Sequence, residues 1–188
     1  MPVRDAEATR QRLIEAARAE FAEFGIAGAR VDRIAANSAS NKAQIYHYFG
    51  SKDRLFDAVW ESIVRQVVDE APLDVTDLPG YAAQLADGYA AHPDLVRIIT
   101  WQRLERGEDA PHAFAVANTR GKVDAIARAQ ADGVLPDDVE PEVLLVLVIH
   151  TAALWATASP DVLAAVGIAD PDRRREIVRD AVARLLAR

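Results

Sequence analysis

The sequence of 188 residues contains no cysteine, which excludes disulfide bridges and metal sites built from thiolates. A reducing compartment is compatible with that absence, and we expect a cytoplasmic protein. The most apolar stretch, residues 143–156, is shorter than the roughly 20 residues that cross a bilayer and predicts a buried helix. The first ten residues have no apolar run, so we expect no secretory signal.

Positive charge is also scarce, because 22 Lys and Arg face 29 Asp and Glu, for a net charge of −7. An acidic protein is a poor partner for nucleic acid, whose phosphates require local positive charge. The distribution weakens this objection. Residues 1–60 hold nine basic and eight acidic side chains, a balance of +1, whereas residues 61–188 hold thirteen and twenty-one, a balance of −8. The N-terminal part can therefore bind DNA only if its basic groups are well placed.

Motifs of common enzymes are missing as well. The sequence has no Gly-x-Gly-x-x-Gly, no Walker A loop, no Gly-x-Ser-x-Gly and no His-Glu-x-x-His. Its four histidines are scattered, without the spacing of a metal site. We therefore expect no enzymatic activity, no cofactor and no metal.

Helical periodicity is what the sequence does contain. Apolar residues recur about every 3.6 positions, and no alternating run of useful length indicates a strand. Glycines and prolines fall where helices could end and begin. The predicted helices are one that carries Leu13 and ends at Gly25, followed by 31–37, 41–47, 52–71, 79–91, 93–106, 111–132, 141–158 and 171–187. The expected fold is all-α, in two parts over 1–51 and 52–188.

The segment 31–52 predicts two short helices joined by a tight turn and supported by the helices on either side. Such a tripod can press the start of its second short helix into a major groove. The side chains expected to face bases are those of Asn41, Lys42, Ala43 and Gln44. Those expected to reach phosphates are Tyr46, His47 and Lys52. Asn41 can instead be only a helix cap, and Lys52 only a solvated charge.

Residues 9–56 resemble the DNA-binding domain of the TetR family of transcriptional regulators. The family's Phe-x-x-x-Gly, Val-x-x-Ile-Ala, Tyr-x-x-Phe and Ser-Lys-x-x-Leu occur within segments 21–25, 31–35, 45–49 and 51–55. The resemblance implies a homodimer, by family default a repressor, that binds double-stranded operator DNA and is released by a small apolar or amphipathic ligand. It also implies a three-helix helix-turn-helix domain over 1–51 and a helical ligand-binding and dimerisation domain over 52–188, with Tyr46 and Lys52 in contact with phosphates. A helical ligand-binding or adaptor module that has lost DNA recognition stays open as an alternative.

Three positions depart from the family pattern. Arg30, a candidate DNA contact, stands where Thr or Ser usually caps the helix that follows. Ala39 stands where Gly usually takes a positive φ, at a cost of roughly 1 kcal/mol. Ser40 replaces an apolar residue. We expect an altered or looser turn, with an effect on operator affinity more than on the fold.

The C-terminal part predicts a dimer interface. The helix over 141–158 is apolar nearly all round, so one face needs a partner, and the helix over 171–187 carries an apolar stripe. Two such helices from each protomer would form the four-helix interface habitual in the family. The candidate interface residues are Ala152, Ala156, Ile177, Val178, Ala181, Val182 and Leu185. Alternatively, both helices belong to the protein's own core.

A mostly apolar ligand pocket is expected between the helix over 52–70 and the helices over 93–106, 111–132 and 141–158. The candidates are polar or aromatic groups on apolar helix faces: Tyr89, Trp101, Phe114, Asn118, His150 and Trp155. Each could also be ordinary core. A ligand that tilts the helix over 52–70 would move Lys52 with it and so weaken DNA binding.

Overall fold

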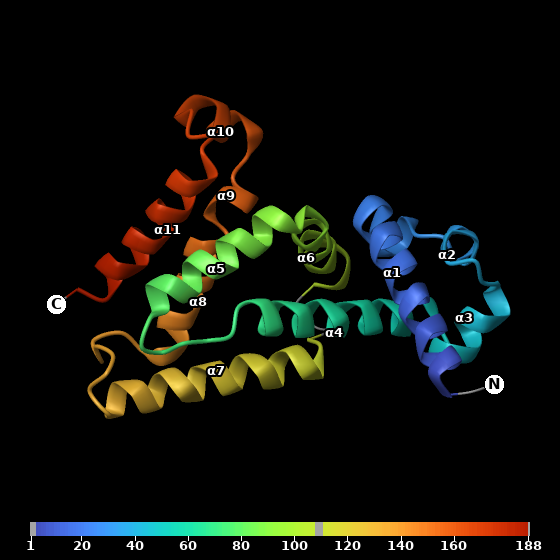
Figure 1. Ribbon diagram of the computed structural model, residues 1–188, viewed down its shortest axis with the longest axis horizontal. Coiled ribbons are helices and arrows are strands. Elements are labelled where there is room, and N and C mark those ends of the chain that lie inside the picture. The colour runs from blue at the N-terminus through green and yellow to red at the C-terminus, as the bar shows by residue number, and fades with distance from the viewer. Residues whose placement is uncertain (1–2, 108–110, 188) are drawn as a thin grey trace. The chain divides into compact units, whose positions relative to one another are not determined.

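The computed structural model describes residues 3–107 and 111–187, and it contains helices but no strand within these ranges (Figure 1). The helices are α1 (Val3–Gly28), α2 (Val31–Asn37), α3 (Lys42–Phe49), α4 (Lys52–Glu70), α5 (Leu78–Ala91), α6 (Pro93–Arg106), α7 (Ala113–Ala131), α8 (Pro141–Ala152), α9 (Leu154–Thr157), α10 (Pro160–Val166) and α11 (Pro171–Leu185). The all-α prediction is confirmed. The helix predicted over 141–158 is interrupted at Ala153, and α10 was not predicted.

Local signals explain where several helices begin. Asn41 accepts a hydrogen bond from the Gln44 backbone N–H at 2.9 Å, and the Gln44 side chain accepts one from the Asn41 N–H at 3.2 Å. This reciprocal capping box satisfies two N–H groups that the first turn of α3 would leave unpaired. Ser51 Oγ caps α4 in the same way, by accepting from the Arg54 N–H at 3.1 Å. Proline occupies the first turn of α8, α10 and α11, as it can without losing a hydrogen bond.

Gly25 interrupts α1. Its backbone has φ 72° and ψ −178°, which is not helical, so the first helix bends where the sequence predicted that it would end. Only glycine adopts this conformation readily, because it has no Cβ.

The chain divides into two compact units. The first comprises Met1–Arg65 and Asp94–His112, and the second comprises Gln66–Pro93 and Ala113–Arg188. The helix α6 therefore belongs with the N-terminal helices, which differs from the division at residue 52 that the sequence suggested. The reason lies in contacts that α6 makes with the end of α1. Arg97 Nε donates to the Ala22 carbonyl at 2.7 Å, and Glu105 accepts from the Ala27 N–H at 2.8 Å.

The first unit is built around an apolar core to which each of its helices contributes. Phe21 of α1 and Phe56 of α4 meet edge to face, with ring centroids 5.2 Å apart. The other fully or nearly fully buried side chains include Leu13, Ile14, Ala17, Ile34, Ile45, Leu55, Val59, Ile63, Leu95 and Ile98. This core fixes the positions of α2 and α3, which are too short to be stable alone.

The second unit has its own core, formed by α5, α7, α8 and α11. It contains Ala152, Val178 and Val182, none of them more than 2% exposed. The structure thus places these three predicted interface residues in the core, where the protein's own side chains cover them. No helix in the described ranges is both long and apolar enough to span a membrane.

Candidate functional site

The helix α3 presents one face to the core of the first unit and leaves the other face in solvent. Ile45 and Phe49 are buried on the inner face. The outer face carries exposed side chains that include Lys42, Ala43 and His47, together with Tyr46, which is 50% exposed. Six of the eight predicted DNA contacts, residues 41–44, Tyr46 and His47, therefore lie at or after the N-terminus of α3, whereas Arg30 precedes α2 and Lys52 begins α4.

The turn between α2 and α3 forms in spite of its unusual sequence. Ala39 has φ 50°, so the predicted positive φ is confirmed. Ser38 Oγ donates to the Ile34 carbonyl at 2.7 Å, and the Ser40 N–H donates to the Ala35 carbonyl at 2.9 Å. Arg30 gives α2 no side-chain cap, as expected. Hydrogen bonds from the two serines thus hold a turn that usually relies on glycine and an apolar residue.

Two of the predicted base-reading side chains have partners of their own. Lys42 Nζ lies 2.6 Å from Asp32 Oδ1, and this hydrogen bond holds the pKa of Asp32 below its ordinary value. Gln44 supplies its side-chain oxygen to the capping box, while its amide N–H groups stay available for an acceptor. Both side chains are at the surface, so binding DNA would require them to exchange or share these partners.

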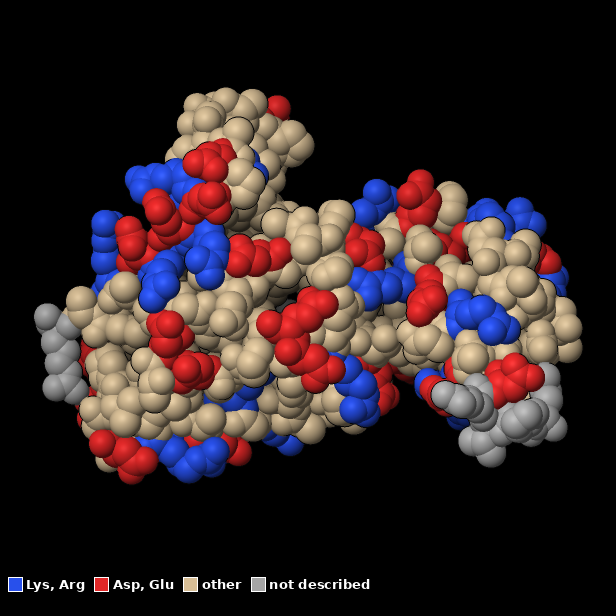
Figure 2. Space-filling view, in the orientation of Figure 1, with Lys and Arg blue, Asp and Glu red and all other residues tan. Residues whose placement is uncertain are grey.

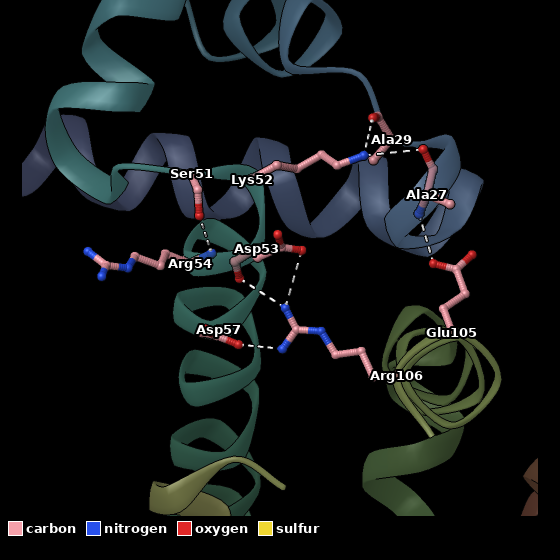
Figure 3. Close-up of polar contacts among 9 residues, drawn as sticks. All are labelled: Ala27, Ala29, Ser51, Lys52, Asp53, Arg54, Asp57, Glu105 and Arg106. Atoms are coloured by element: carbon pink, nitrogen blue, oxygen red, sulfur yellow. Dashed lines mark hydrogen bonds and ion pairs between the residues drawn. The ribbon is translucent and has the colours of Figure 1, made fainter. Parts of the chain in front are cut away.

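Lys52 lies at the start of α4 and reaches back to the end of α1 (Figure 3). Its Nζ donates to the carbonyls of Ala27 and Ala29, each at 3.2 Å. Since an ammonium group has three N–H donors, one is left for a further acceptor such as a phosphate oxygen. The two carbonyls thereby hold the charge in place near the exposed start of α4.

The end of α6 forms a polar network with α1 and α4 that the sequence did not predict (Figure 3). Arg106 forms an ion pair with Asp57 at 2.5 Å and donates to the Asp53 carbonyl at 3.1 Å. Its guanidinium also lies over the Phe56 ring, 4.6 Å from the centroid. Glu105 accepts from the Ala27 N–H, and the carbonyl of Ala27 accepts from Lys52. The spacing Trp101-x-x-x-Glu105 was the available signal, because it places both side chains on one face of α6.

The second unit contains a pocket of about 270 Å³ between α5, the α8–α9 region and the start of α11. Its lining includes Tyr89, Trp155, Ala152 and Ala156, so the structure brings together two of the six predicted pocket residues and two predicted interface residues. Trp155 Nε1 donates to the Arg174 carbonyl at 3.1 Å, and the Arg174 guanidinium lies 5.2 Å from the centre of the indole. Burial raises the pKa of Tyr89.

The other predicted pocket residues lie elsewhere. Trp101 belongs to the first unit, where its indole covers Gly25. Phe114 and Asn118 lie half-buried on α7. His150 is exposed, with Nδ1 2.8 Å from the Val146 carbonyl. In the described ranges, no group of three or more His, Asp or Glu side chains is arranged to hold a metal ion.

Several large apolar side chains are exposed on α8, α9 and α11. Val143, Val146 (53% exposed), Leu147 and Leu154 are exposed along α8 and α9, and Leu185 is 39% exposed near the end of α11. We call these five residues the apolar strip. Of the other predicted interface residues, Ile177 and Ala181 are half-buried on α11. Basic and acidic side chains alternate over α11, whereas α10 is almost uncharged (Figure 2).

Comparisons with known proteins match both parts of the chain. Residues 13–59 match the family described as bacterial regulatory proteins, tetR family, and residues 77–184 match the tetracyclin repressor-like C-terminal domain. The HTH-type transcriptional repressor SCO4008 of Streptomyces coelicolor is 40% identical, and the match covers all of both chains. The HTH-type transcriptional repressor NicS of Pseudomonas putida is 32% identical over 71% of this chain and 69% of its own. The solved structure of the transcriptional regulator SCO4942 from Streptomyces coelicolor is 40% identical, with a TM-score of 0.84 over 96% of this chain and 99% of that one.

Proposed function

The chain belongs to the TetR family of bacterial transcriptional regulators, and on that basis we propose that it represses transcription as a homodimer that leaves its operator when a small molecule binds. The observation that carries this proposal is the exposed outer face of α3, which stands on a helical platform whose core is closed. A helix held in this way can enter a major groove without unfolding its neighbours. The curated relatives SCO4008 and NicS are named as repressors, which favours repression over activation.

We assign sequence readout to residues 41–44 and phosphate contact to Tyr46, His47 and Lys52. Arg30 stays a candidate contact. The primary test is selection of double-stranded DNA from a random pool at low salt, which should enrich a pseudo-palindrome whose half-sites lie about 34–36 Å apart. Enrichment of no sequence would contradict the proposal and favour a ligand-binding module without DNA recognition.

Substitution Lys52→Ala tests the phosphate contact. It should weaken binding to all sequences alike and lower the salt-dependence slope by about one, because one fewer counterion is released. The matched control is Arg128→Ala, which removes an exposed positive charge from α7 of the second unit and should leave the slope unchanged. An unchanged salt-dependence slope for Lys52→Ala would show that this ammonium only donates hydrogen bonds to the carbonyls of Ala27 and Ala29 and contacts no phosphate.

The apolar strip is our candidate for the dimer interface, because members of the family act as dimers and an apolar surface of this kind is costly in water. Val146→Glu should give a monomer in sedimentation experiments, since the partner would have to bury an unpaired charge. Leu104→Glu is the matched control, because Leu104 is also an exposed apolar residue but lies on α6, outside the apolar strip. If the Val146→Glu protein remains dimeric, the dimer interface does not include the apolar strip.

We infer that α6 transmits the ligand signal to the DNA-binding surface. The contacts that support this role lie within the first unit: Glu105 accepts a hydrogen bond from the Ala27 N–H, and the Ala27 carbonyl accepts one from Lys52 (Figure 3). Loss of the Glu105 contact should loosen Lys52 without removing any DNA-contacting group. We expect Glu105→Ala to change operator affinity by roughly 2- to 30-fold, the range for residues that couple two sites. The exposed Glu142→Ala, in α8, should leave it unchanged, and an equal effect of both variants would contradict the inference.

A further inference from the structure

Lys122 of α7 is a half-buried cation whose polar partner in the structure is neutral. Its Nζ donates to Tyr81 Oη at 2.9 Å and lies 5.4 Å from the centre of the Tyr81 ring, which is 2% exposed. Among the described residues, no carboxylate lies within ion-pair distance of Lys122. Lysine is seldom buried without such a partner, because removing an ammonium group from water is costly.

The position of Lys122 along α7 marks the border of the core of the second unit. One and two turns further on, Ile126 and Ala129 are buried among the side chains of that core. One and two turns back, Asn118 and Phe114 lie half-buried on the same face, since residues four apart share one side of a helix. Along this face of α7, the side chains thus change from buried and apolar to half-buried and partly polar. The ammonium group of Lys122 lies where this change occurs.

The Lys122 ammonium and the Tyr81 hydroxyl can both donate hydrogen bonds to a third group, an acceptor. The Tyr81 oxygen accepts from Lys122, so the hydroxyl proton of Tyr81 is free to donate, and the ammonium keeps two further N–H donors. Burial raises the pKa of Tyr81 to about 12, so the hydroxyl stays protonated at neutral pH. Burial also lowers the pKa of Lys122, and a bound anion would counteract that effect.

We propose that Lys122 and Tyr81 bind the anionic group, a carboxylate or sulfonate, of the small molecule that regulates this protein, with the apolar body of that molecule lying along α7 toward Asn118 and Phe114. This assignment rests on the proposed function as a ligand-controlled regulator, and it adds the chemical class of the ligand. It differs from the site in the α5–α9–α11 pocket, where the cations Arg174 and Arg175 already have partners. A neutral or cationic regulator would not need Lys122.

The test uses two fluorescent probes of nearly the same shape, anilinonaphthalene sulfonate and its uncharged analogue phenylnaphthylamine. The full-length protein is titrated with each probe at neutral pH and without DNA. We expect Lys122→Met to weaken the sulfonate probe by roughly 10- to 150-fold, the range for a hydrogen bond to a charged group, and to leave the neutral probe within about twofold. Tyr81→Phe should weaken the sulfonate selectively but less, and Lys42→Met, which removes a lysine from the DNA-binding surface, should change neither probe.

Stability measurements separate a binding role from a structural one. If Lys122 serves ligand binding, partial burial of its ammonium group costs free energy in the ligand-free protein. Lys122→Met should therefore leave the free energy of unfolding unchanged or raise it. Equal weakening of both probes, or a destabilised Lys122→Met protein, would overturn the proposal. So would wild-type protein that binds the two probes equally, or loss of sulfonate binding in Arg174→Met instead of Lys122→Met. Operator binding is measured separately, so its absence would refute the proposed function and leave the probe result interpretable.

Discussion

Gly25 is the position at which a single added methyl group should do the most damage to the first unit. The substitution Gly25→Ala places a Cβ on a residue with φ 72° and ψ −178°. That Cβ would lie 2.6 Å from Glu105 Oε1 and 2.9 Å from two carbon atoms of the Trp101 ring. Both neighbours belong to α6, so the change acts directly on the contact between α1 and α6.

Two costs contribute to the predicted loss of stability. A non-glycine residue in this backbone region costs about 1–3 kcal/mol. Overpacking against a fixed ring adds about 1–3 kcal/mol, because the end of Glu105 can rotate away but the indole of Trp101 must shift. The expected decrease in the free energy of unfolding is therefore roughly 2–6 kcal/mol, a large fraction of the total for an ordinary domain.

Urea unfolding followed by circular dichroism measures this loss. The matched control is Gly88→Ala in the interior of α5, where the added Cβ meets no atom within 4 Å. That variant should gain about 0.5–1 kcal/mol, since alanine is the better helix former. The same chemical change should thus have opposite signs at the two glycines.

A double-mutant cycle with Trp101→Ala separates the two costs. If the ring contact contributes, the loss from Gly25→Ala should be smaller by about 0.5–3 kcal/mol when Trp101 is already absent. A Gly25→Ala protein whose stability lies within about 0.5 kcal/mol of the wild type would refute both the strained backbone and the close approach of α6.

Three further predictions concern the turn, the cap of α3 and the alkaline limit of stability. Ala39→Gly should stabilise the protein in urea unfolding by up to about 1 kcal/mol, because it relieves the φ of 50°, whereas the β-branched Ala39→Val should destabilise it. Asn41→Ala should cost about 0.5–2 kcal/mol by the same measurement, through loss of the capping box, and no loss would mean that the box contributes nothing. Because the pKa of Tyr81 is raised to about 12 in the folded protein, its contribution is fully present below about pH 10 and is lost as pH rises toward 12, since the unfolded chain releases its proton first. Tyr81→Phe should therefore remove a fall of up to about 1.4 kcal/mol per pH unit in that window, and an unchanged alkaline slope in pH-dependent unfolding would contradict this.

The sequence alone determined the features that depend on neighbours in the chain. Helix starts and ends were predicted within about two residues at most positions, because a cap such as Asn41 or a stop such as Gly25 acts over a single turn. The helix-turn-helix and the positive φ of Ala39 were predictable for the same reason: each follows from a short pattern with a local physical requirement.

Tertiary structure alone decided which helix faces meet. Val178 and Val182 formed an apolar stripe that predicted an interface and left a core as the alternative, and only the packing of α11 showed that they lie in the core. Arg106 and Lys122 gave no sequence signal, because their partners Asp57 and Tyr81 are 49 and 41 residues away. A periodic pattern specifies that a face will be buried but not what will cover it, since the covering residues depend on how distant helices pack.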